Sequence, residues 1–500
     1  MSLLRSALSV SFGTLLSRLF GFIRDVIIAA KLGSSPINDA FITAFRLANI
    51  LRNIFAEGAL SIVFVPEFSK SLNKDGRKKA FLLASRVHLL LILFLTLITI
   101  VGLIMMPEVI WYTAPGFRNK PEVFKITVLF ARITFPYLLC ISLAAFYGGV
   151  LNTFNRFLPF ALAPTILNIL TIIALMFFDY FPTTGHTLSL ATIISGVMEL
   201  LWMIFFLLKY NCKLSWEKSY ITPQTKQIFK KMLPIIFSAG ITHLNIWISI
   251  IILSFFAGGI TYVYYAERII QLPLALIGTA IGTVLLPALA KSFAQKSNAQ
   301  IIVIQNKAIN IALFLVIPAS LALFFLANEI ILLLFERDNF TREDTENTAK
   351  VLCILSAGLP AFVMVKLFQT KFYANLNTKI PVIISVSCMA VNVLISAFAM
   401  QTLQFKGVAL ANIVSGWLNF LALLIFSYIK IGFKFHVKTF VQIIKYIAAS
   451  VLMILAIYLW REHMLFLAQR LLIISEIIIG FFTYLAACYI FRVDLHAKNW

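Results

Sequence analysis

FYGGVLNTFNRFLPFALAPTILN at residues 146–168 and FYANLNTKIPVIISVSCMAVN at residues 372–392 are two copies of one pattern. In each copy an FY pair precedes an NT pair, a proline and an asparagine, and the offset between the copies is 222–226 residues. A second pair of segments, VFVPEFSK at 63–70 and VLLPALAK at 284–291, is 221 residues apart. Two pairs in the same order at nearly one offset indicate that half of the chain is duplicated.

The composition around these segments is that of a membrane protein. The 500 residues are 61% hydrophobic and 12% charged, with a mean hydropathy of +0.95, which is too apolar for a water-soluble globule. The formal net charge of +22 is explained most simply by basic cytoplasmic loops, and no nucleic-acid-binding module is visible. The five cysteines are scattered without CxxC spacing, so neither a disulfide framework nor a zinc site is predicted.

Apolar runs and their polar interruptions predict an all-α polytopic protein with fourteen transmembrane helices. The predicted spans are 6–32, 38–66, 81–107, 124–152, 158–179, 185–208, 232–257, 264–290, 307–335, 348–374, 379–401, 406–430, 440–460 and 467–491.

Alternate loops differ in charge, which predicts the orientation. The segments 70–79 and 209–231 and the region of Lys430 to Lys438 are basic, and all three follow even-numbered helices. The segment 336–350 is instead rich in acids. Because cytoplasmic loops are enriched in Lys and Arg, both termini are expected in the cytoplasm.

The duplication predicts the division of the chain. Residues 1–220 form an N-terminal lobe of six helices and residues 221–438 a second six-helix lobe of the same topology. Residues 439–500 hold two further helices outside the duplication.

Charged side chains interrupt the first two spans, where each costs several kcal/mol at mid-membrane even on lenient scales. They are Arg18, Arg24, Asp25, Asp39, Arg46, Arg52 and Glu57. Their helical spacing, with Ser17 and Asn49 nearby, predicts the wall of a polar cavity. Arginine binds phosphate or carboxylate oxygens bidentately and stays charged when buried, so arginines converging here suit a diphosphate.

Other charges in the spans are less informative. Arg268 stands beside Glu267 at the start of the eighth span and is a third candidate anion ligand. Glu199, His243, Lys366 and Glu476 are each isolated, and we assign them no role from sequence. The alternative for all of these groups is a structural ion pair. No hydrolase, nucleotide-binding or metalloprotease motif is present.

The segments SRLFGFIRDVIIAAKLG, NDAFITAFRLANILRNIFAEGALSIVFVPEFSK, YYAERIIQLP and LNTFNRF resemble the MurJ (MviN) family of lipid II flippases. The resemblance covers essentially the whole chain and is most specific in residues 14–70. It implies a fourteen-helix member of the multidrug/oligosaccharidyl-lipid/polysaccharide (MOP) exporter superfamily, with two lobes around a cationic cavity and a lipid-tail groove at about 440–491.

The resemblance also implies the activity. The family moves lipid II, the undecaprenyl-diphosphate-linked disaccharide pentapeptide, from the cytoplasmic to the periplasmic leaflet of the bacterial inner membrane for peptidoglycan synthesis. The implied substrate-binding residues are Arg18, Arg24, Arg268, Ser17, Asp25 and Asn49, and the implied gating or ion-pair residues are Asp39, Arg52, Glu57 and Glu267.

The expected mechanism is alternating access by a monomer that needs no cofactor and no metal and uses the membrane potential or a coupled ion. Some family members have a sodium site with acids on the seventh and eleventh helices, but this chain has His243 and Asn392 there, so sodium coupling is not expected. Two alternatives stay open: a MOP exporter of another polyprenyl-diphosphate-linked glycan, and a polytopic enzyme that acts on such a lipid.

Overall fold

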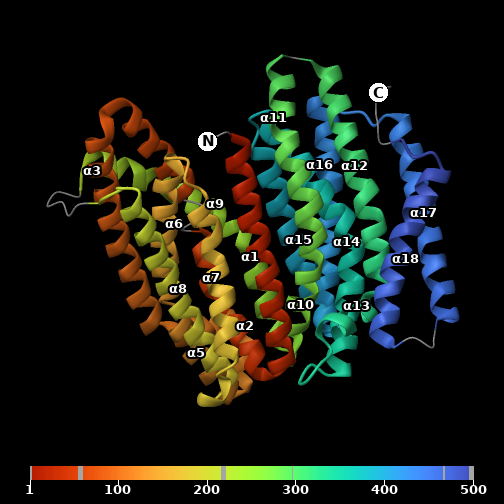
Figure 1. The fold of residues 1–500 in the computed structure, drawn as a ribbon, viewed down its shortest axis with the longest axis horizontal. Helices are drawn as coiled ribbons and strands as arrows, with labels where there is room; N and C mark the ends of the chain where they lie inside the picture. Colours follow the sequence, from red (N-terminus) through yellow and green to blue (C-terminus); the bar gives the residue numbers. More distant parts are fainter. Residues whose placement is uncertain (1–2, 55–59, 215–220, 296, 465–467, 495–500) are drawn as a thin grey trace. The chain divides into compact units, whose positions relative to one another are not determined.

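The computed structural model describes residues 3–54, 60–214, 221–295, 297–464 and 468–494 (Figure 1). Within these ranges the chain is helical and contains no strand beyond one isolated bridge between Arg337 and Phe340. The helices are α1 (Leu3–Leu32), α2 (Pro36–Arg52), α3 (Ser61–Ile104), α4 (Met106–Thr113), η2 (Pro115–Asn119), α5 (Pro121–Thr134), α6 (Tyr137–Thr153), α7 (Leu158–Leu175), η3 (Phe178–Tyr180), α8 (Thr184–Lys209), α9 (Pro223–Leu253), α10 (Gly259–Pro273), η4 (Leu274–Thr279), α11 (Ala280–Ala294), α12 (Asn298–Phe325), α13 (Ala327–Phe335), α14 (Arg342–Ala374), α15 (Lys379–Leu403), α16 (Phe405–Ile431), α17 (Val437–His463) and α18 (Gln469–Ile490).

The all-α membrane fold predicted from sequence is confirmed. Among the described residues, eleven helices are long and apolar enough to cross a membrane. The other three predicted spans, the first, second and seventh, correspond to α1, to α2 with the start of α3, and to α9.

The turn between α1 and α2 follows directly from its sequence, KLGSSPIND. Gly33, just after α1, adopts a left-handed φ of 55°, which a glycine tolerates without strain. Ser35 caps α2 through its side chain, which accepts from the backbone N–H of Asn38, and Pro36 occupies the first helical position. This turn fixes where the charged stripe of α2 begins.

Several predicted boundaries were wrong. Residues 70–79, predicted as a loop, continue α3 as a helix, broken at Gly76, whose φ of 83° is accessible mainly to glycine. The acid-rich segment 336–350 is helical from Arg342 onward. The eighth span contains a π-helical turn, and the ninth ends at Phe325 before the separate helix α13. Hydropathy alone misses such breaks because they leave the apolar composition unchanged.

The chain forms two compact units, Met1–Thr261 and Tyr262–Trp500. α9 packs against α3 and α4 and therefore belongs to the first unit by contact. The division by packing thus falls one helix later than the boundary at residue 220 that the duplication predicts. The predicted boundary marks where the repeated sequence begins again, whereas the two units are defined by packing. The division into 1–220, 221–438 and 439–500 therefore stays a prediction.

Helix ends repeat at one offset. Asn155 after α6 and Leu376 after α14 both have left-handed φ values, 57° and 55°, and lie 221 residues apart (376 − 155). Asn211 after α8 and Gly432 after α16 are also left-handed, at 54° and 64°, and also 221 apart (432 − 211). Each of the four residues closes a helix by turning the chain back onto its last carbonyls. The same offset as in the VFVPEFSK and VLLPALAK pair supports the duplication.

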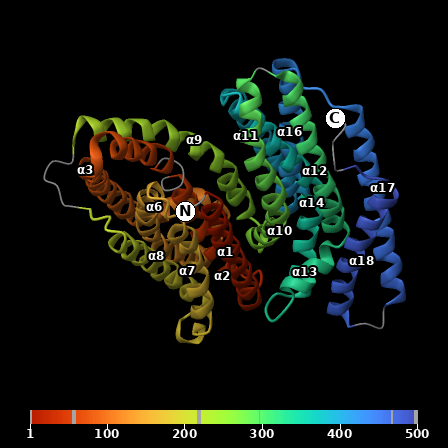
Figure 2. The same cartoon turned by 45° about the horizontal axis from the view of Figure 1, so that its top comes forward.

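The two C-terminal helices belong to the second unit. α17 and α18 lie side by side, and α17 packs along α12 (Figure 2). Asn306 of α12 accepts hydrogen bonds from the His436 backbone and the Thr439 hydroxyl at the start of α17, at 3.2 and 2.9 Å. The Tyr484 hydroxyl of α18 donates to the Phe314 carbonyl at 2.6 Å. These contacts hold the extra helices against the repeat.

Candidate functional site

Arg24 lies in a buried setting built by three helices of the first unit. It is 6% exposed, and its Nε and one terminal nitrogen donate to Asp25 Oδ1 at 3.1 and 2.7 Å. The other terminal nitrogen donates to Asn168 Oδ1 of α7 at 3.0 Å, and the Phe45 ring of α2 lies 5.5 Å from the guanidinium carbon. The position of this guanidinium is therefore set in advance of any ligand.

Asn168 connects this arginine to the fold. Its Nδ2 donates to the Ser17 carbonyl on α1 at 2.9 Å while its Oδ1 accepts from Arg24. α1 and α7 run side by side in Figure 1, and Gly21 faces the amide. A Cβ at Gly21 would lie 3.3 Å from Nδ2, so the missing side chain allows this close approach. Gly21, which lies between Arg18 and Arg24, thus leaves room for the Asn168 side chain.

Asp39 caps a different helix. Its Oδ2 accepts from the Gly258 backbone N–H at 2.9 Å, and its Oδ1 accepts from the backbone N–H and hydroxyl of Thr261 at 3.0 and 2.7 Å. These donors lie at the start of α10, where the N–H groups have no partner within the helix. Asp39 is 2% exposed, so the carboxylate is bound by the helix start rather than by water.

The remaining predicted residues of the first unit are less enclosed. Arg18 is exposed, and Ser17 contributes its carbonyl to Asn168. Arg52 is half-buried, and its Nε donates to Asn49 Oδ1 at 3.2 Å, one turn earlier on α2. Glu57 lies outside the described residues. Asp25, which shares a helical face with Arg18, is paired with its neighbour Arg24 instead.

Arg268 and Glu267 belong to the second unit, where both are half-buried on α10. A terminal nitrogen of Arg268 donates to the Tyr264 hydroxyl at 2.7 Å, and its guanidinium carbon lies 4.9 Å from the centre of the same ring. Tyrosine four residues earlier therefore orients this arginine.

Two of the isolated charges acquire a clear structural setting. Glu476 of α18 is fully buried and accepts two hydrogen bonds from Arg461 of α17, at 2.6 and 3.0 Å. Arg461 also pairs with Glu329 of α13 at 2.8 Å, so this cluster ties three helices together. Glu199 of α8 is equally buried, but neither of its oxygens has a hydrogen-bond partner among the described residues.

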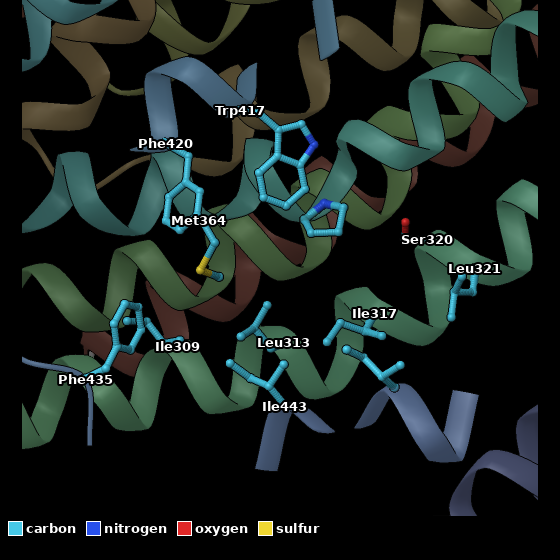
Figure 3. A pocket seen from close by; sticks show the side chains of 12 residues that line it. Ile309, Leu313, Ile317, Ser320, Leu321, Met364, Trp417, Phe420, Phe435 and Ile443 are labelled. Carbon is cyan, nitrogen blue, oxygen red and sulfur yellow. The ribbon is translucent and has the colours of Figure 1, made fainter. Parts of the chain in front are cut away.

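An apolar cavity of about 470 Å³ lies in the second unit (Figure 3). Its walls come from α12, α14, α16 and α17, and the close-up shows the side chains of Leu313, Met364, Phe420 and Ile443 around the open space. The Ser320 hydroxyl at its edge donates to the Ser356 carbonyl at 2.7 Å and is already satisfied. The cavity therefore suits hydrocarbon rather than a charged headgroup.

Within the described ranges no three His, Cys, Asp or Glu side chains approach closely enough to hold an ion. Asn392 on α15 donates to Asn412 Oδ1 of α16 at 2.9 Å.

Comparison with known proteins decides the family. A family model described as "Lipid II flippase MurJ" matches residues 28–478. The chain belongs to this family. A probable lipid II flippase MurJ of Rickettsia prowazekii (strain Madrid E) is 35% identical over 506 aligned positions, covering 99% of this chain and 98% of that protein. The probable lipid II flippase MurJ of Rhizobium tropici is 38% identical, covering 86% and 81%.

Solved structures agree with the MurJ assignment. One described as "Lipid II flippase MurJ, inward closed conformation" has a TM-score of 0.84 at 27% identity and covers 97% of this chain and 99% of that one. A multidrug resistance MATE family transporter of the MOP superfamily has a TM-score of 0.69 at 15% identity, covering 85% and 98%, which shows a shared fold alone. The chain is thus a multi-pass membrane protein of a transporter family rather than an enzyme.

Sequence reasoning missed Asn168 as a site residue, although it marked the residue as part of the repeat. The available signal was a polar amide eleven residues after an NRF turn, in a helix without charges, which corresponds to Asn392 in the other copy. The contact with Arg24 joins residues 144 positions apart, which no periodicity reveals.

Proposed function

We propose that the chain moves lipid II, the undecaprenyl-diphosphate-linked disaccharide pentapeptide, from the cytoplasmic to the periplasmic leaflet by alternating access. Membership of the MurJ family over residues 28–478 carries this proposal. The buried Arg24 adds a physical reason, because its guanidinium is held in place by Asp25 and Asn168, stays charged and carries N–H donors of the kind that bind phosphate oxygens.

In this proposal the arginines bind the diphosphate. Arg24 is held by Asp25 and Asn168, so little side-chain entropy is lost when an anion takes up its remaining capacity. Arg18 is exposed and meets the ligand first, and Arg268, oriented by Tyr264, is the candidate anion ligand of the second unit. Ser17 and Asn49 complete the polar wall.

The gate in this proposal includes Asp39, Arg52, Glu57 and Glu267. Asp39 stabilises one conformation when it caps the start of α10, and a conformation that separates the two leaves three donors unpaired. Arg52, held by Asn49 in this arrangement, is available for a different partner when the helices move.

The lipid tail would occupy apolar surface near the C-terminal helices. α17 contributes Ile443 and Ile447 to the cavity described above, and α12, α14 and α16 supply the rest. A polyprenyl chain bound in this cavity would be shielded from water and would leave no polar group unpaired.

We also propose the membrane orientation, the oligomeric state and the energy source of the protein. Both termini lie in the cytoplasm of a bacterial inner-membrane protein, the monomer is sufficient, and no cofactor is required. The membrane potential resets the empty cationic site, at about 2.3 kcal/mol per charge per 100 mV. A topology reporter after Lys231 should give a cytoplasmic signal, and a periplasmic signal there would overturn the orientation.

The decisive experiment is reconstitution of the purified chain into vesicles with labelled lipid II in one leaflet. Transport should appear in the wild type and vanish in Arg24→Ala. Transport of a different polyprenyl-diphosphate glycan with no transport of lipid II would reassign the substrate. Chemical conversion of lipid II without transfer between leaflets would favour the enzyme alternative.

A further inference from the structure

Glu199 is a buried acid that forms no ion pair within 4 Å among the described residues. It is 0% exposed on α8 and lies about 4 Å from the midpoint of that helix at 1.5 Å per residue. Both carboxyl oxygens are enclosed, and neither has a hydrogen-bond partner in the described part of the chain. An ionised carboxylate in such a place lacks both water and donors.

The surroundings of Glu199 are tightly packed. Gly196, one turn earlier, faces α6, where an added Cβ would lie 2.6 Å from the Tyr137 ring and 3.2 Å from Cys140 Cβ. The backbone amide of Leu167 on α7 is near the carboxyl group but does not reach hydrogen-bonding geometry. Gly196 thus allows α8 to approach α6 closely one turn before Glu199.

Four helices that differ in their titratable groups pack against α8. α2 presents Arg52, which interacts electrostatically with Glu199 but forms no ion pair with it within 4 Å. α6 presents Tyr137 and Cys140, and α7 carries no titratable residue. α5 also packs on α8, but its charged residues Glu122, Lys125 and Arg132 are exposed.

Glu476 provides the contrast. It is an equally buried glutamate on α18, and Arg461 binds both of its oxygens. The chain therefore pairs one intramembrane glutamate fully and leaves the other near an arginine that is engaged elsewhere, with Asn49. Burial without hydrogen-bond donors disfavours the charged form of a carboxyl group, so Glu199 is expected to carry a proton in this arrangement.

We propose that Glu199 is a proton-binding site of the first unit, protonated in the arrangement described and deprotonated when Arg52 approaches it during the transport cycle. The proton is taken from water and returned to water, and the arriving guanidinium replaces its charge. Proton binding is thereby linked to the position of the end of α2. The link to transport rests on the proposed flippase cycle, whereas proton binding itself does not.

The direct test is infrared difference spectroscopy of the purified full chain at a series of pH values. A protonated carboxyl group in an apolar site gives a C=O stretch that is resolved from the amide bands. The wild type and Glu476→Gln should both show a band that disappears at alkaline pH, and Glu199→Gln should lack it. A spectrum of Glu199→Gln identical to the wild type would overturn the proposal.

Two further variants test the details. Glu199→Asp, which keeps a carboxyl group, should retain a band at a shifted position, and this separates a lost proton site from a misfolded protein. Arg52→Gln, which removes the approaching charge, should keep the band to higher pH than the wild type. Loss of the band at the same pH in Arg52→Gln would exclude Arg52 as the partner that displaces the proton.

Transport provides the functional readout. Lipid II transfer by the wild type should vary with pH by up to about tenfold per pH unit on one limb, because a single group titrates. Glu199→Gln should flatten this profile and Glu476→Gln should not. A wild type that shows the infrared band but transports no lipid II would refute the proposed function while leaving the proton site intact. An unchanged pH profile in Glu199→Gln would refute the coupling.

Discussion

The interiors of α8 and α16 show how two copies of one scaffold have diverged. Both helices end at left-handed residues, Asn211 and Gly432, which are 221 positions apart. At the same offset, Glu199 of α8 corresponds to Phe420 of α16, which lines the apolar cavity. The backbone turns are shared because every helix end needs its carbonyls satisfied, whereas the interior chemistry is free to differ.

The difference extends beyond one position. The first unit buries Arg24, Asp25 and Asp39 with partners from several helices, while the second unit has a partly open apolar cavity of about 470 Å³. An amphipathic lipid needs both kinds of surface. These two surfaces agree with the proposal above that the first copy binds the charged diphosphate and the second accommodates the hydrocarbon tail.

The largest expected effect is at Arg24. Arg24→Ala should abolish lipid II transport and also reduce stability by about 3–5 kcal/mol, because Asp25 is left buried and unpaired. The measurements are vesicle transport and the folded protein level. The double variant Arg24→Ala/Asp25→Ala removes both charges, so it should recover protein level without transport. Recovery of transport in the double variant would show that the pair is purely structural.

The next effect concerns Asp39. Asp39→Asn keeps one acceptor oxygen where two are used, so the cap on α10 should weaken by about 1–3 kcal/mol. If this cap stabilises one conformation, accessibility of engineered cysteines to a thiol probe should shift toward one side of the membrane.

Ser35→Ala is the matched control for Asp39. It removes the cap of α2 and should cost about 0.5–2 kcal/mol without shifting accessibility. The background should lack all five native cysteines. The native cysteines would otherwise react with the probe to different extents. Burial raises the pKa of the Cys212 thiol and slows its reaction, whereas Cys353 is only half-buried and is more accessible to the probe. An equal shift of accessibility in both variants would remove Asp39 from the gate.

A smaller effect is expected at Asn168 and Asn392, the asparagines at corresponding positions of the repeat. Asn168→Ala loses its hydrogen bonds with Arg24 and with the Ser17 carbonyl, and Asn392→Ala loses its bond to Asn412, so stability should fall by about 1 kcal/mol for each bond lost. Only Asn168→Ala should also reduce transport, by about fivefold if that energy is lost from the positioning of Arg24. Equal transport losses would show that the two copies do not differ in this respect.

The smallest effect is expected in the cavity. Leu313→Phe places a larger side chain into it and should weaken binding of the long-chain lipid by about fourfold for each methylene displaced, near 0.8 kcal/mol. Leu315→Phe, on the exposed face of the same helix, is the control. The measurement is competition between long- and short-prenyl lipids. Equal preference in both variants would exclude the cavity as a tail site.

The sequence by itself determined the membrane class, the helix count and the duplication. These depend on composition, on apolar length and on repeated local motifs, all of which are properties of neighbouring residues. The turn from Gly33 to Pro36 was also readable, since each residue acts through its own backbone preference. The resemblance of residues 14–70 to the MurJ family indicated candidate functional charges but not their partners.

Only the tertiary structure decided which groups meet. Asp25 pairs with Arg24, Asn168 reaches across 144 residues to the same guanidinium, and Asp39 caps a helix 219 residues away. Glu199 and Glu476 look alike in sequence, yet Glu476 is paired with Arg461, whereas Glu199 has no hydrogen-bond partner among the described residues. Burial and hydrogen bonding depend on which helices pack together, and helical periodicity specifies a face of a helix but not the neighbour that covers it.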